Sequence, residues 1–154
     1  MRGEITDYRE SLRRRVALLD GLDTEALASV YHQRMRLSPG AEALVAAARA
    51  AGLKTLLVSG GFTFFTDRLR DRLGLDFARS NTLGLRDGKL DGTVVGEIVD
   101  AEVKARTVAE VCAELGIATS RAIVMGDGAN DLKMMKIAGL SVAFRAKPVV
   151  RAQA

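Results

Sequence analysis

The stretch that decides the fold is "SRAIVMGDGANDLKMMKIAGLSVAF", residues 120–144. It contains a short apolar run, a glycine-rich loop, a segment with helical spacing and a second apolar run. Short apolar runs bounded by glycine are typical of buried strands, whereas apolar residues at helical spacing indicate a helix. The order strand, loop, helix, strand is that of a parallel α/β sheet.

A second stretch with the same order lies upstream. After "SPG" at 38–40, the segment "AEALVAAARAAG" (41–52) is predicted to be a helix and "KTLLVSGG" (54–61) a buried strand. The segment "FTFFTDRLRDRLGL" (62–75) then returns to helical spacing. Parallel sheets bind ligands at the carboxyl ends of their strands, and both glycine loops follow such ends.

The remaining segments are predicted to form helices and a hairpin. Helices are expected over 8–19 and 24–35, the second beginning at Asp23-Thr24, and another over "DAEVKARTVAEVCAELGI". The segment "NTLGLRDGKLDGTVVGEI" (81–98) predicts a β-hairpin that turns tightly at Asp87-Gly88.

Composition limits the classes of protein that fit. The 154 residues suffice for one domain, and 48% hydrophobic with 27% charged residues is ordinary for a globular protein. The single cysteine excludes an intrachain disulfide, and one Cys with one His cannot form a zinc cluster. We interpret His32, on a surface helix, and Cys112, on an apolar helix face, as structural.

The net charge of +4 does not indicate nucleic-acid binding, because the basic residues are scattered and few aromatics accompany the cluster at 13–15. A solvated surface and an anionic small-molecule site explain it better. Charged residues interrupt the longest apolar stretch (41–58), so no membrane span is expected. The N-terminus is not a signal peptide, and a cytoplasmic location is the default.

Ser59 leaves the first strand just before Gly60-Gly61 and a helix. Glycines let backbone N–H groups approach a ligand, and a helix start favours an anion. The pattern therefore predicts a phosphate site, with a plain strand-to-helix turn as the alternative.

Three charged residues surround the second loop. Asp127 follows a buried strand, where a lone carboxylate is costly unless it is paired. Asp131 can cap the next helix or support a metal ligand, and Mg²⁺ suits a carboxylate beside a phosphate. Lys104 lies near the start of a helix, where its positive charge is unfavourable next to the helix dipole. An anion within reach of its ammonium group would explain this position. The alternative for Asp127 and Asp131 is that both are loop acids that cap a helix. The alternative for Lys104 is a lysine exposed to solvent.

Four motifs in order resemble the phosphoserine phosphatases of the haloacid dehalogenase superfamily. The resemblance runs from Met1 to about Pro148, and the ordered set is far more specific than any one motif. It implies a Rossmann-like parallel sheet with part of a helical cap domain. The motifs are "SLRRRV" (11–16), "VSGGF" (58–62), "VKA" (103–105) and "GDGANDLKM" (126–134).

The resemblance implies a role for each matching residue. Arg15 would bind the substrate carboxylate, Ser59 and the Gly60 amide the phosphate, and Lys104 would neutralise the phosphoryl group. Asp127 would be the Mg²⁺ ligand, and Asp131 would support the residues around the metal without binding the ion itself. The remaining residue, Asn130, would lie at the substrate phosphate.

The same resemblance implies that the chain is truncated at its N-terminus. Met1 and Gly3 match the family's cap motif Ala-Met-x-Gly, so 1–36 would be the remainder of the cap and 37–154 an incomplete core. The sequence contains no Asp-x-Asp, the pair that the family uses as nucleophile and general acid. The absent strand would be the central one, and losing its buried side chains would cost about 6–15 kcal/mol.

Three hypotheses remain open. The first is a chain related to the phosphoserine phosphatases, which act in serine biosynthesis. This chain alone would be inactive, because no aspartyl-phosphate intermediate can form without the nucleophilic aspartate. The second is a non-catalytic binding module, and the third a related phosphatase for another small phosphate ester. For the fold, we expect one of two arrangements of the strands 55–60 and 122–127. Either they pair directly, or a segment from elsewhere in the chain or from a second copy lies between them.

Overall fold

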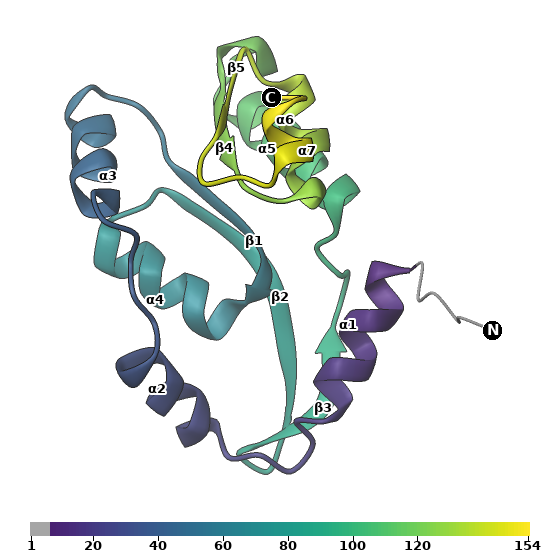
Figure 1. Cartoon of the computed structure of the whole chain (residues 1–154). Helices are drawn as coiled ribbons and strands as arrows, with labels where there is room; N and C mark the ends of the chain where they lie inside the picture. The colour runs from purple at the N-terminus through teal and green to yellow at the C-terminus, as the bar shows by residue number, and fades with distance from the viewer. Residues whose placement is uncertain (1–6) are drawn as a thin grey trace. The chain divides into compact units, whose positions relative to one another are not determined.

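A computed structural model describes residues 7–154, which form two compact units divided between Ile98 and Val99. The first unit contains helices and a three-stranded sheet, and the second contains helices and a two-stranded parallel sheet (Figure 1). The predicted α/β class is confirmed. The predicted division into a cap (1–36) and a core (37–154) concerns the domains of the family and not these compact units, and it stays a prediction. Met1 and Gly3 lie outside the described residues.

The first unit has four helices: α1 (Tyr8–Ala17), α2 (Thr24–Gln33), α3 (Ala41–Ala50) and α4 (Thr63–Leu73). An aspartate carboxylate accepts an N–H group at two of their starts. Asp7 accepts from Arg9 before α1, and Asp23 accepts from Glu25 before α2, both at 2.9 Å. The predicted helix start at Asp23-Thr24 is confirmed.

Strand β2 (Phe77–Arg86) is shared between two pairings. Its first half runs parallel to β1 (Leu56–Phe62) and its second half antiparallel to β3 (Lys89–Val95). The hairpin turn is confirmed, because Asp87 (φ 51°) and Gly88 (φ 76°) both have the left-handed backbone of a tight turn. The strand also begins four residues before the predicted hairpin. That part of β2 is paired with β1, a long-range contact that local alternation does not reveal.

The core of the first unit lies between α1, α2 and the hairpin. Helix α1 packs on β3 so closely that a Cβ on Gly92 would lie 3.3 Å from the backbone of Ala17. His32 is exposed on α2, as predicted. The buried core residues are Leu12, Val16, Leu27, Leu83, Leu90 and Ile98.

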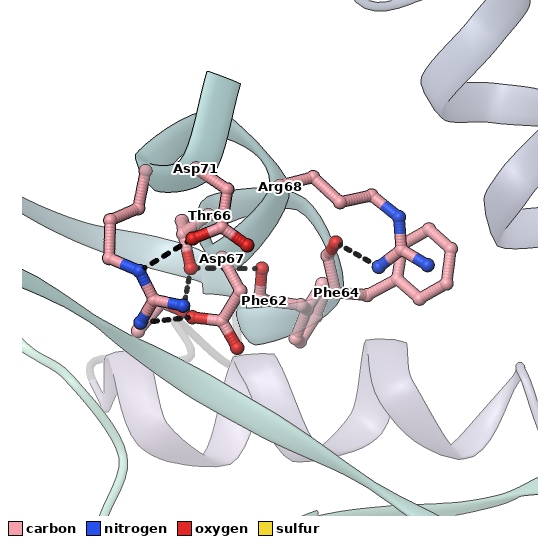
Figure 2. Close-up of polar contacts among 8 residues, drawn as sticks. Phe62, Phe64, Thr66, Asp67, Arg68 and Asp71 are labelled. Atoms are coloured by element: carbon pink, nitrogen blue, oxygen red, sulfur yellow. Dashed lines mark hydrogen bonds and ion pairs between the residues drawn. The ribbon is translucent and has the colours of Figure 1, made fainter. Parts of the chain in front are cut away.

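Helix α4 is fixed at its first turns by side-chain contacts (Figure 2). The hydroxyl of Thr66 lies 2.6 Å from that of Ser80 on β2, and both residues are buried. The Arg68 guanidinium donates to the Phe64 carbonyl and lies 3.6 Å from the centroid of the Phe64 ring. The Thr66–Ser80 contact holds the start of α4 on the sheet, directly after Gly60-Gly61, while the Arg68–Phe64 contacts lie within the helix.

The second unit contains α5 (Ala101–Glu114), β4 (Ile123–Gly126), α6 (Leu132–Ile137), β5 (Leu140–Ala143) and α7 (Pro148–Arg151). Single 3₁₀ turns cover Thr119–Arg121 and Ala129–Asp131. Strands β4 and β5 pair in parallel from Ile123 opposite Leu140 to Gly126 opposite Ala143. Cys112, predicted on an apolar helix face, is buried, and so are Met134 and Met135.

The prediction that the apolar run before Asp127 is a buried strand holds for only one face of β4. Val124 is buried, but Ile123 is 61% and Met125 43% exposed. Successive strand residues point to opposite faces, so β4 is covered on one face only. In β1, every residue is half-buried.

The expectation for the strands around Ser59 and Asp127, direct pairing or a segment between them, stays a prediction, because β1 and β4 belong to different units. Each is an edge strand, β1 of the three-stranded and β4 of the two-stranded sheet. Among residues 7–154, no helix is long and apolar enough to span a membrane.

Candidate functional site

The end of β1 bulges at the predicted phosphate loop. Val58 is paired with Arg79 and Phe62 with Asn81, so three residues of β1 stand opposite one residue of β2. The three residues are Ser59, Gly60 and Gly61, and α4 begins two positions later. The bulge presents this backbone next to a helix start, where the N–H groups and the dipole favour an anion.

Two hydrogen bonds hold this bulge. The Gly61 N–H donates to Ser59 Oγ at 3.0 Å, and Asn81 Nδ2 donates to the Gly60 carbonyl at 2.9 Å. Asn81 is only 1% exposed. Sequence reasoning missed it, although an asparagine inside an apolar strand pattern is a signal of a buried polar contact.

Arg15 lies in the last turn of α1 and is exposed. Its Nε donates to the Ser11 carbonyl of its own helix at 3.3 Å. This contact does not join Arg15 to the Ser59 loop, and the predicted carboxylate-binding role stays a prediction.

In the second unit, the carboxylate of Asp131 organises the glycine loop. Its Oδ2 accepts the N–H groups of Asp127 and Gly128, each at 3.1 Å. Its Oδ1 accepts from Lys104 Nζ at 2.8 Å, and both side chains are 7% exposed. The structure therefore brings together three of the residues predicted from the sequence.

Asp131 caps the 3₁₀ turn that leads into α6, because its carboxylate accepts the Gly128 N–H from the third position of that turn. It occupies the N-cap position of α6 but makes no side-chain cap hydrogen bond there. The carboxylate turns back toward the loop instead, because two loop N–H groups and a buried ammonium offer it three partners. Gly126 makes room for it, since a Cβ there would lie 2.5 Å from that of Asp131.

The pKa of Asp131 lies below its ordinary value. Burial by itself raises this pKa, but the hydrogen bond from Lys104 and those from the loop N–H groups outweigh burial. Asp131 is thus a carboxylate at neutral pH, and it compensates the charge of Lys104. The alternative of a solvated lysine is wrong, because Lys104 is buried.

Asp127 is exposed at the end of β4, so the expected cost of a buried lone carboxylate does not arise. Asn130 is also exposed, with its Oδ1 2.5 Å from the place of a Cβ on Gly128. Among the described residues, no group of three His, Cys, Asp or Glu side chains could hold a metal ion. One open carboxylate still fits Mg²⁺, which often keeps several waters and binds one or two carboxylates beside a phosphate.

Comparison with known proteins places this geometry in a family. The sequence matches the haloacid dehalogenase-like hydrolases over residues 2–136, and the chain belongs to that family. Within it, the relatives that it resembles are phosphoserine phosphatases. The sequence is 60% identical to the phosphoserine phosphatase of Polaromonas sp. (strain JS666) over 100% of this chain and 67% of that protein. It is 58% identical to that of Albidiferax ferrireducens over 98% of this chain.

Solved structures agree with this assignment. The crystal structure of a probable phosphoserine phosphatase from Vibrio cholerae, in unliganded form, superposes with a TM-score of 0.92 at 43% identity. It matches over 96% of this chain and 46% of its own length. The chain spans 65% of the Albidiferax ferrireducens protein.

Proposed function

We propose that this chain provides substrate- and metal-binding parts of a phosphatase that hydrolyses phosphoserine to serine and phosphate. The observation that carries the proposal is the 60% identity, across the whole chain, to a protein named phosphoserine phosphatase. The bulged loop at Ser59 and the carboxylate loop at Asp127 follow the carboxyl ends of β1 and β4, which supports it. A cytoplasmic location belongs to the same proposal.

In the first unit, Ser59 and the Gly60 N–H group would bind the phosphoryl oxygens. The Ser59 oxygen already accepts the Gly61 N–H, so its own hydrogen can be donated to a phosphate oxygen. Arg15 would pair with the substrate carboxylate, and its exposed position leaves its guanidinium accessible.

In the second unit, Asp127 would hold Mg²⁺ and Asn130 would lie at the phosphate. When bound, Mg²⁺ would offset the negative charge of the phosphoryl group. Asp131 would support the metal site indirectly. Its carboxylate accepts the backbone N–H of Asp127 and the ammonium group of Lys104, and it would keep both residues in position. Lys104 would keep a positive charge directed to the phosphoryl group.

We also propose that these 154 residues alone do not turn over phosphoserine. The sequence has no Asp-x-Asp, so it lacks the nucleophile and general acid that the family's chemistry requires. Activity would need a strand that carries this pair, and the open edges of β1 and β4 are where a strand from another segment or a second copy could add.

The test is to measure phosphate release from phosphoserine with Mg²⁺, using this chain and a version extended at its N-terminus by an apolar strand with Asp-x-Asp. We expect release only from the extended protein, and its loss on Asp127→Ala. Turnover by the 154 residues alone, lost on Asp127→Ala, would contradict the proposed inactivity.

A panel of esters tests the substrate. Phosphoserine should be preferred over a phosphate ester that lacks the carboxylate, and Arg15→Ala should remove the preference. A folded extended protein that prefers a different ester would support a related phosphatase of other specificity. A folded extended protein that hydrolyses none would support a binding module.

A further inference from the structure

We propose that Asn81 is a positioning residue for the phosphate loop. It would hold the Gly60 carbonyl so that the Gly60-Gly61 peptide and the Ser59 hydroxyl stay oriented toward an anion. The proposal rests on the proposed phosphate-binding role of Ser59 and Gly60, and it adds a residue that touches neither substrate nor metal.

The geometry fixes one peptide unit at both ends. The Gly60 carbonyl and the Gly61 N–H belong to the same planar peptide. Asn81 Nδ2 donates to the carbonyl at 2.9 Å, and Ser59 Oγ accepts from the N–H group at 3.0 Å. Rotation of this peptide would break both hydrogen bonds.

The fixed peptide sets the direction of the Ser59 hydroxyl. A hydroxyl has one hydrogen to donate and two lone pairs. Because the Gly61 N–H occupies one lone pair of Ser59 Oγ, the hydrogen must point away from that N–H group. Without Asn81, the peptide and the hydroxyl would both gain freedom.

Two successive glycines need such an anchor. Glycine has more backbone freedom to lose than any other residue, so Gly60-Gly61 has little preference of its own for the bulged conformation. Asn81 is 1% exposed, so its amide is held away from water, which would otherwise compete for the carbonyl. The anchor is therefore available before any ligand binds.

The experiment is a titration of the 154-residue chain with inorganic phosphate, followed by NMR on the amides of Gly60 and Gly61. In the wild type, these two signals and the Asn81 side-chain amide should move with one common Kd. In Asn81→Ala, the Kd should rise about three- to tenfold, as expected for one lost hydrogen bond, and the Gly61 amide should exchange faster without phosphate.

Ser80→Ala is the matched control, because it removes a buried side-chain hydrogen bond from the neighbouring β2 residue without touching Gly60. It should leave the phosphate Kd within twofold. Equal Kd values for Asn81→Ala and the wild type, or equal weakening by Ser80→Ala, would overturn the role of Asn81 while phosphate binding stands. If phosphate moves neither glycine signal in the wild type, the proposed phosphate role fails and this inference falls with it.

If Asn81→Ala does not fold, two wild-type measurements decide. We expect slow exchange of the Asn81 side-chain amide and its response to phosphate with the Kd of Gly60. Fast exchange, or a signal that phosphate does not move, would overturn the role of Asn81.

Discussion

Lys104 and Asp131 are two charged residues removed from water together. Each side chain is 7% exposed, and the ion pair is 2.8 Å long. A buried pair of this kind contributes little net stability compared with an apolar pair, but removing one partner leaves an uncompensated charge. The pair therefore fixes the position of Lys104 and makes it sensitive to changes at Asp131.

Asp131→Asn should destabilise the protein by about 3–5 kcal/mol, because the Lys104 ammonium loses its counter-charge while the side chain keeps its shape. Urea unfolding measures this loss. Lys133→Met is the control, since it removes only the exposed ion pair with Glu102 and should cost less than about 1 kcal/mol. Equal effects would show that Lys104 is more hydrated than its burial indicates.

The lowered pKa of Asp131 predicts a pH dependence. A carboxyl whose pKa is lower in the folded than in the unfolded protein stabilises the fold above the unfolded pKa, about 4, and loses this effect as pH falls through the folded pKa. The difference in unfolding free energy between wild type and Asp131→Asn should thus shrink below about pH 4. A difference that stays constant from pH 7 to pH 3 would contradict it.

At the scale of elements, the connection from α6 to β5 passes very close to the 3₁₀ turn before β4. A Cβ on Gly139 would lie 1.7 Å from the backbone oxygen of Ser120. Backbone cannot give way as the end of a flexible side chain can. Glycine at this position is therefore a packing requirement of the second unit.

Gly139→Ala should destabilise the second unit by on the order of 3 kcal/mol, the upper end of the cost of overpacking. Gly116→Ala is the control, because its Cβ would meet nothing within 4 Å and only the left-handed backbone (φ 67°) would cost about 1–2 kcal/mol. Thermal unfolding of both variants measures the comparison. A smaller loss for Gly139→Ala would mean that the 3₁₀ turn moves aside easily.

Local patterns predicted helices α1 to α6, the hairpin turn and the strands around Ser59 and Asp127, but not the short helix α7. They did not predict the parallel part of β2, which pairs with residues of β1 that lie 19 to 21 positions earlier in the chain. They left open whether Asp131 caps a helix or supports a metal ligand, because spacing shows that a carboxylate is near a helix start but not which donors it accepts. Asn81 was missed for the same reason, since its partner Gly60 lies on another strand.

For the whole molecule, the described residues form two sheets, in which β1 and β4 are edge strands. Neighbouring residues of a strand direct their N–H groups to opposite edges. Within Leu56-Leu57 and within Ile123-Val124, we therefore expect one slowly and one rapidly exchanging amide. Hydrogen exchange followed by NMR tests this. Slow exchange at all four would show that a second copy or another segment covers the edges.

The buried cysteine makes the second unit observable on its own. Cys112 is the sole thiol of the chain, it is 5% exposed, and it lies on α5. A thiol reagent reaches such a side chain only when the surrounding helices open, so its labelling rate follows the population of the opened unit. Labelling kinetics would record the loosening caused by a change at Asp131 or Gly139, while motions confined to residues 7–98 would leave no trace in the signal.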